Sequence, residues 1–211
     1  GIKLKKGIAI TFAFAVITAM PFLWPSLLTV RGTGGWSTSG LELLFPILFA
    51  FAIWLLRSIA RFSQPPERRE QAEKENLSTQ ITLGIVLGCV LGIWLSGELR
   101  MHGFELAAER AEPLIEAIEK YTHDNGEPPG SIAALVPAYF AELPKKLPPV
   151  EIVTDPKKLP EYGDNPWALT ALVSRGLMNW DRFIYFPDQA YPERGFGGGL
   201  ERVRSWAYVH E

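Results

Sequence analysis

Hydrophobic residues form three long runs within the first hundred residues, and the remainder of the chain mixes apolar and polar positions. The runs cover about residues 8–30, 41–59 and 77–97. At about 1.5 Å per residue, each run approaches or exceeds the length that a hydrocarbon core about 30 Å thick requires. The pattern therefore predicts three transmembrane helices.

The third run continues without a break into a charged amphipathic stretch. Its apolar residues recur at steps of three and four, which places them on one face of a helix; they are Phe104, Ala107, Ala108, Ala111, Leu114, Ile115, Ile118 and Tyr121. Pro113 lies inside this pattern, so we expect the helix to bend there or a new helix to start. Asn125-Gly126 is expected to end the helix, because either residue can adopt the left-handed backbone conformation that often follows a helix.

The last sixty residues are typical of short strands and turns. Residues 150–154, 167–173, 182–186 and 204–209 are rich in β-branched and aromatic residues, and Pro, Gly and Asp separate them. Ser131 is expected to cap a short helix over residues 132–136. We expect an antiparallel sheet that packs on the amphipathic helix and buries Phe104, Leu114, Ile118, Leu169 and Ile184.

Together these elements predict two parts. Residues 1–97 form an α-helical membrane domain with three spans, and residues 98–211 form a small extracytoplasmic α+β domain. Within that domain, a long helix packs on an antiparallel sheet.

Charge sets the expected orientation. Up to Gly97 there are nine basic and five acidic residues, whereas from Glu98 onward there are twelve basic and eighteen acidic residues. The N-terminus and residues 57–74 are rich in Lys and Arg, whereas residues 31–40 contain only Arg31. The positive-inside rule therefore places the N-terminus and the loop between the second and third runs in the cytoplasm. The 98–211 domain is then periplasmic, at a bacterial inner membrane. An acidic domain also argues against binding of nucleic acid.

Two further features concern the membrane half. Lys3, Lys5 and Lys6 before the first run also occur in signal peptides, but this run is longer than a signal core, so we expect a retained anchor. Tryptophans lie near the predicted membrane edges, as an aromatic belt requires; they are Trp24, Trp36, Trp54 and Trp94.

Gly84, Gly88 and Gly92 repeat every four residues in the third run. This spacing places them on one helix face, where another helix can approach to backbone contact. The partner is either the first or second span, with Ala13, Ala15 and Ala19 on the first, or a second protein or a second copy of the chain. The lipid bilayer is the other expected partner.

Few residues point to chemistry. Three arginines and two aromatic residues near the C-terminus form a candidate site for an anionic or carbohydrate ligand; they are Arg194, Arg202, Arg204, Trp206 and Tyr208. The three histidines, His102, His123 and His210, lack metal-ligand spacing, and no nucleophile motif is present. No catalytic residue, metal site or cofactor is therefore expected.

The segment after the amphipathic helix resembles a known family. Its order is Tyr121, Asn125-Gly126, Pro128-Pro129, Ser131-Ile132, Leu135-Val136-Pro137, Tyr139-Phe140 and Leu143-Pro144. This order, over about residues 78–145, is similar to the soluble start of pseudopilins and type IV pilin-like proteins. The resemblance implies a membrane helix that continues into an amphipathic helix and a small sheet. The prepilin processing motif is missing, because Asn76-Leu77-Ser78-Thr79 stands in its place without the following Glu.

Three functional hypotheses follow. The first is a non-enzymatic inner-membrane protein with a periplasmic pilin-like domain, acting as a structural or interaction subunit of an envelope assembly. The second is a periplasmic ligand-binding or sensor module that uses the arginine and aromatic residues. The third, and the weakest, is an enzyme at the membrane face.

Overall fold

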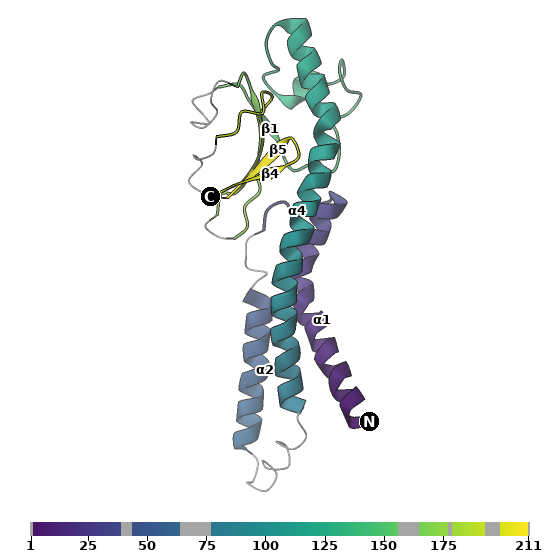
Figure 1. Cartoon of the computed structure of the whole chain (residues 1–211), viewed down its shortest axis with the longest axis vertical. Coiled ribbons are helices and arrows are strands. Elements are labelled where there is room, and N and C mark those ends of the chain that lie inside the picture. The colour runs from purple at the N-terminus through teal and green to yellow at the C-terminus, as the bar shows by residue number, and fades with distance from the viewer. Residues whose placement is uncertain are drawn as a thin grey trace. The chain divides into compact units, whose positions relative to one another are not determined.

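The computed structural model of the chain describes residues 2–38, 44–63, 77–155, 165–176, 179–192 and 199–210 (Figure 1). The chain divides into two compact units. The first consists of Gly1–Pro25 and Gly40–Glu98, and the second of Ser26–Ser39 and Leu99–Glu211. The division expected from the sequence at residue 98 places residues 26–39 in the membrane domain, whereas the structure places them in the second unit.

Helices α1 (Ile2–Arg31), α2 (Leu44–Phe62) and the first part of α4 (Leu77–Asn125) make up most of the first unit. Two helical stretches, Lys5–Arg31 and Thr79–Asn125, are long and apolar enough to cross a membrane. Helix α2 covers most of the predicted second span, although residues 41–43 lie outside the described residues. By length and composition these two stretches are candidate membrane spans.

Helix α4 runs without interruption for 49 residues and includes Pro113. Of the two alternatives expected at this proline, a bend or the start of a new helix, the second is therefore wrong. Proline removes the hydrogen bond to the carbonyl four residues earlier, which belongs to Glu109. Both residues are exposed, so water can solvate the free carbonyl and the helix continues. The predicted stop is confirmed, because Gly126 follows the helix with φ +77°.

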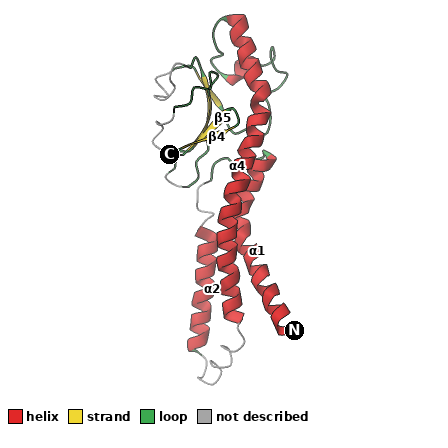
Figure 2. Ribbon diagram, in the orientation of Figure 1, coloured by secondary structure: helices red, strands yellow, loops and turns green. Residues whose placement is uncertain are grey.

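The second unit contains an antiparallel five-stranded sheet in the order β1-β2-β3-β5-β4, seen in yellow beside the red helix α4 in Figure 2. The strands are β1 (Glu151–Val153), β2 (Ala168–Leu172), β3 (Arg182–Tyr185), β4 (Leu200–Val203) and β5 (Trp206–Val209). The four predicted strand segments are confirmed, and β4 is an addition.

The amphipathic stripe of α4 packs on one face of this sheet, which confirms the predicted helix-on-sheet arrangement. Phe104, Leu114, Ile118 and Leu169 lie in the shared core as predicted. Ile184 is also buried, but it belongs to a smaller cluster with Ala168, Phe186 and Val209. Successive residues of a strand point to opposite faces, and Ile184 follows Phe183, which occupies the helix side.

The sequence predicts no strand over residues 200–203, where β4 lies. Val203 pairs with Trp206, so only Arg204 and Ser205 connect β4 to β5. Arg204 adopts φ +57°, a left-handed conformation that hairpin turns require and that Gly or Asn usually supplies. The tight turn therefore lacks the usual sequence signature.

The short helix after α4 is a 3₁₀ turn, Ile132–Leu135. Ser131 precedes it, but its side chain makes no capping hydrogen bond, contrary to the prediction. Its backbone carbonyl instead accepts a hydrogen bond from the amide of Ala134 at 3.1 Å. Leu135 anchors the turn, because its side chain is fully buried in the core shared by α4 and the sheet.

Candidate functional site

Within the first unit, the three glycines of α4 face successive turns of α1. A Cβ built on Gly88 would lie 2.9 Å from the Cα of Ala15 and would also overlap the side chain of Thr18. The corresponding neighbours are Thr11 and Phe14 for Gly84, and Ala19 and Phe22 for Gly92. Of the partners that the sequence leaves open, the structure therefore places α1 against this face. Ala13 is not among the nearest neighbours.

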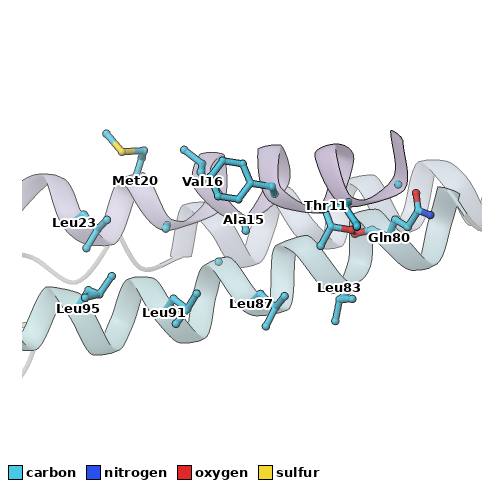
Figure 3. A pocket seen from close by; sticks show the side chains of 15 residues that line it. Thr11, Ala15, Val16, Met20, Leu23, Gln80, Leu83, Leu87, Leu91 and Leu95 are labelled. Carbon is cyan, nitrogen blue, oxygen red and sulfur yellow. The ribbon is translucent and has the colours of Figure 1, made fainter. Parts of the chain in front are cut away.

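An apolar groove of about 630 Å³ follows this seam between α1 and α4. Its floor includes the small residues Ala15, Ala19 and Gly88. Larger side chains form its walls, among them Val16, Met20, Leu83, Leu87 and Leu91 (Figure 3). One end of the groove is more polar, because Gln80 and Thr11 lie there. The Thr11 hydroxyl donates to the main-chain carbonyl of Gln80 at 3.1 Å.

Within the second unit, the side chain of Arg100 is only 4% exposed and holds three main-chain carbonyls. Its guanidinium donates to the carbonyl oxygens of Gly35 at 2.8 Å and Trp36 at 2.7 Å, and also to that of Val173. It lies 5.1 Å from the centre of the Phe104 ring. A buried cation requires such acceptors, and the planar fork of arginine can serve several at once. Arg100 thus ties the segment after α1 to both α4 and the sheet.

That segment, residues 32–38, is an integral part of the second unit. The amide of Thr38 donates to the Ser174 carbonyl at 2.9 Å, and the Thr38 carbonyl accepts from the amide of Gly176 at 2.9 Å. Trp36 is 8% exposed and contacts Phe104 with ring centres 5.7 Å apart. The prediction that Trp36 belongs to an aromatic belt is therefore wrong, whereas Trp24, Trp54 and Trp94 are exposed.

The polar network continues from Arg100 through Tyr208 to Asp181. The Tyr208 hydroxyl donates to Oδ2 of the buried Asp181 at 2.6 Å. Burial raises the pKa of Tyr208 to about 12, with the hydrogen bond to Asp181 as a further cause. Burial, followed by the positive charge of Arg100, lowers the pKa of the nearby Arg175. The arrangement fixes the segment after α1 in place, since the guanidinium donates to main-chain carbonyls.

The four described members of the ligand site expected from the sequence do not share one exposed surface. Trp206 and Tyr208 are almost fully buried on the helix side of the sheet, and Arg194 lies outside the described residues. Arg202 stacks 3.9 Å above the Tyr191 ring and donates to Gln189 at 2.8 Å. Arg204 instead pairs with Glu109 of α4 at 3.3 Å. Trp206 and Tyr208 lie two residues apart on β5 and so share one face, and that face packs in the core.

Arg100 is a buried charged residue that the sequence pattern does not single out. A signal for it does exist, because Arg100 lies four residues before Phe104 and so extends the apolar stripe of the helix. A charged residue on a buried stripe requires a partner. The acceptors come from residues 35, 36 and 173, which are far apart in the sequence, so spacing alone cannot identify them.

Across the described parts of the chain, no group of three or more His, Cys, Asp or Glu side chains could hold a metal ion. Comparisons with protein-family models, curated proteins and solved structures gave no match.

Proposed function

We propose that the chain is a membrane-anchored, non-enzymatic protein that presents its α+β unit to a partner as a structural or interaction subunit of an envelope assembly. The observation that carries this proposal is the Arg100 tie. It joins the segment that follows one apolar helix to the continuation of another. A unit that is connected to two apolar helices is held at the membrane more firmly than a domain that is attached through a single linker.

The same tie supports three spans. Residues 26–38 and residues from 99 onward belong to one unit, so the ends of α1 and α4 lie on the same side of the bilayer if both helices cross it. The chain must then return across the membrane between residues 39 and 77. Helix α2 (Leu44–Phe62) is the apolar helix in that interval, and Phe51, Trp54 and Leu56 expose apolar surface on it. This topology supports α2 as the third span.

The basic residues favour a cytoplasmic N-terminus and a periplasmic α+β unit at a bacterial inner membrane. The pilin-like relationship is part of the same proposal. It is supported by α4, which continues from an apolar segment into an amphipathic helix packed on an antiparallel sheet. Because the processing motif is missing, we propose a pilin-like domain that stays on its anchor.

Partner binding can be tested in native membranes with a photoreactive amino acid at exposed positions of the second unit. Leu172 and Trp180 are suitable, because they are 51% and 56% exposed and both are apolar. A matched probe at Lys120, an exposed polar position of α4, serves as the control. The proposal expects one discrete adduct in constant ratio to the chain at 172 or 180 and none at 120. A chain that stays monomeric with no adduct at any position contradicts it.

The second hypothesis, a ligand-binding module, is less well supported by the geometry. Arg202 and Arg204 are engaged with Gln189, Tyr191 and Glu109 within the unit. Part of the donor capacity of both guanidinium groups is therefore already used within the unit. The structural or interaction role is therefore the better supported of the two.

A further inference from the structure

The groove between α1 and α4 has the composition of a site for hydrocarbon. Its lining is almost entirely apolar, and many wall residues are well exposed, such as Phe12 at 69%, Leu83 at 50% and Leu91 at 47%. In a membrane-spanning helix pair these side chains face the bilayer, where acyl chains are the surrounding solvent. An acyl chain is therefore the expected occupant of the groove.

The dimensions suit one lipid chain. The volume of about 630 Å³ lies within the range of roughly 300–1,000 Å³ found for small-molecule pockets. Along α4 the lining extends from Gln80 to Leu95, which at about 1.5 Å per residue exceeds half of a hydrocarbon core about 30 Å thick. An extended acyl chain of one leaflet thus fits lengthwise.

The two ends of the groove differ in polarity. At one end Gly7 and Gln80 are part of the lining, and the Gln80 amide lies so close to Gly7 that a Cβ there would overlap it. Lys5 and Lys6 directly precede Gly7 and are exposed. At the other end Leu23 and Leu95 are apolar, as Figure 3 shows.

Within the described residues of α1 and of the first part of α4, this polar end carries positive charge and no carboxylate; Glu73 and Glu75, which precede α4, lie outside the described residues. The first turns of α1 and α4 contain no acidic residue. Along α4 the first acidic residue is Glu98, beyond the far end of the lining at Leu95. Lysine ammonium groups near a bilayer surface attract anionic headgroups, and an amide N–H can donate to a phosphate oxygen.

We propose that the α1–α4 groove binds one anionic phospholipid, with an acyl chain along Ala15, Ala19 and Gly88 and its phosphate held by Lys5, Lys6 and the Gln80 amide. The proposal requires α1 and α4 to lie in a bilayer, but it is independent of the partner that the proposed function invokes. The lipid fills the space that the small residues of the seam leave open.

The test uses the full chain, purified in a neutral detergent and examined by native mass spectrometry with added phosphatidylglycerol or phosphatidylcholine. The wild type is expected to bind one phosphatidylglycerol in preference to phosphatidylcholine. Replacing Lys5 and Lys6 by Gln should lower the affinity for phosphatidylglycerol by about thirtyfold. The same change at Lys120 and Lys145, exposed lysines of the second unit, should have no effect.

A second pair of variants tests the groove itself. Val16→Trp fills the groove from its wall, whereas Ile17→Trp adds the same side chain at an exposed position of α1 that is not part of the lining. The proposal expects Val16→Trp to remove the bound lipid and Ile17→Trp to keep it, with equal helical content in both. Equal binding of the two lipids by the wild type, or equal retention by the two variants, would overturn the proposal. The proposal would also be overturned if the wild type were a dimer and Val16→Trp converted it to a monomer without removing bound lipid.

Discussion

The guanidinium of Arg100 donates to the carbonyl oxygen of Trp36 over 2.7 Å. The two residues are separated by 64 positions, and an apolar helix lies between them in the sequence. Their contact, together with the hydrogen bonds to Gly35 and Val173, makes residues 26–39 part of the α+β unit. The segment between the first and second apolar helices is thus a structural element rather than a spacer.

Replacement of Arg100 tests this tie. Arg100→Met leaves three carbonyls without their donor, and a hydrogen bond to a charged group contributes about 1.5–3 kcal/mol. We expect the α+β unit to lose about 2–4 kcal/mol of stability, measured as a lower midpoint of denaturant unfolding by near-ultraviolet circular dichroism. Arg100→Lys should recover only part of the loss, because an ammonium lacks the planar fork.

The matched control for Arg100 is Arg204→Met. This change removes an ion pair with Glu109 in which both side chains are about half exposed. Exposed pairs contribute about 0–1 kcal/mol, so the midpoint should change little. Equal effects of the two substitutions would argue against a special role of Arg100.

Trp36 provides a second test of the same segment. Its side chain is 8% exposed and contacts Phe104, so Trp36→Ala should leave a cavity in the core. Buried Trp to Ala changes cost about 3–5 kcal/mol. Trp24→Ala, at an exposed position of α1, should leave the unfolding midpoint of the α+β unit unchanged. If both variants unfold like the wild type, Trp36 is not a core residue.

The glycine seam allows the same substitution to be compared at two places in one helix. Gly88→Ala would bring a Cβ into contact with Ala15 and Thr18, so α1 and α4 must separate. We expect a destabilisation of about 1–3 kcal/mol, seen as a lower thermal midpoint of helical circular dichroism in detergent. At Gly97 no described atom lies within 4 Å of an added Cβ.

Gly97→Ala should therefore be neutral or should stabilise the helix by up to about 1 kcal/mol, since Ala has the higher helix propensity. Both variants gain the same propensity, so their difference reports the packing of the seam alone. A lower midpoint for Gly97→Ala than for Gly88→Ala would contradict the observed contacts.

Alkaline pH should unfold the α+β unit through Tyr208. Its pKa is raised from 10 to about 12, mainly by burial, so the neutral phenol is favoured in the fold by roughly 3 kcal/mol. This stabilisation is complete below pH 10 and is lost as the pH rises through about 12. Absorbance of the phenolate and the unfolding midpoint, followed together over this range, measure the effect. Tyr208→Phe should be less stable at neutral pH but should show a shallower loss at alkaline pH.

Periodicity in the sequence predicts the helix-on-sheet unit well. The stripe from Phe104 to Tyr121 and the four strand segments each follow from local patterns that burial on one face imposes. Strand β4 is missed because its hairpin turn, Arg204-Ser205, lacks the glycine or asparagine that normally marks a left-handed conformation. The burial of Trp206 and Tyr208 is missed because alternation shows a common face but not which side it packs against.

Contacts between distant segments could not be predicted in the same way. Arg100 lies on an apolar stripe, which indicates that it needs a partner. Its acceptors are main-chain carbonyls, which every residue carries, so the sequence does not show which residues provide them. Trp36 likewise resembles a membrane-edge tryptophan in the sequence, because its neighbour Phe104 is distant along the chain. The glycine seam shows the opposite case, because a repeat of small residues predicts close helix contact and the fold supplies α1 as the neighbour.

Amide hydrogen exchange over residues 32–38 of the full chain tests the central claim most directly. If these residues belong to the α+β unit, the amides of Thr33 and Thr38, which donate to the Leu28 and Ser174 carbonyls, should be protected. We expect the protection at Thr38 to match that of Val173, which follows β2 and whose amide donates to the Asp181 carbonyl, and to fall in Arg100→Met. Exchange of Thr38 at the rate of an open loop in the wild type would contradict the account.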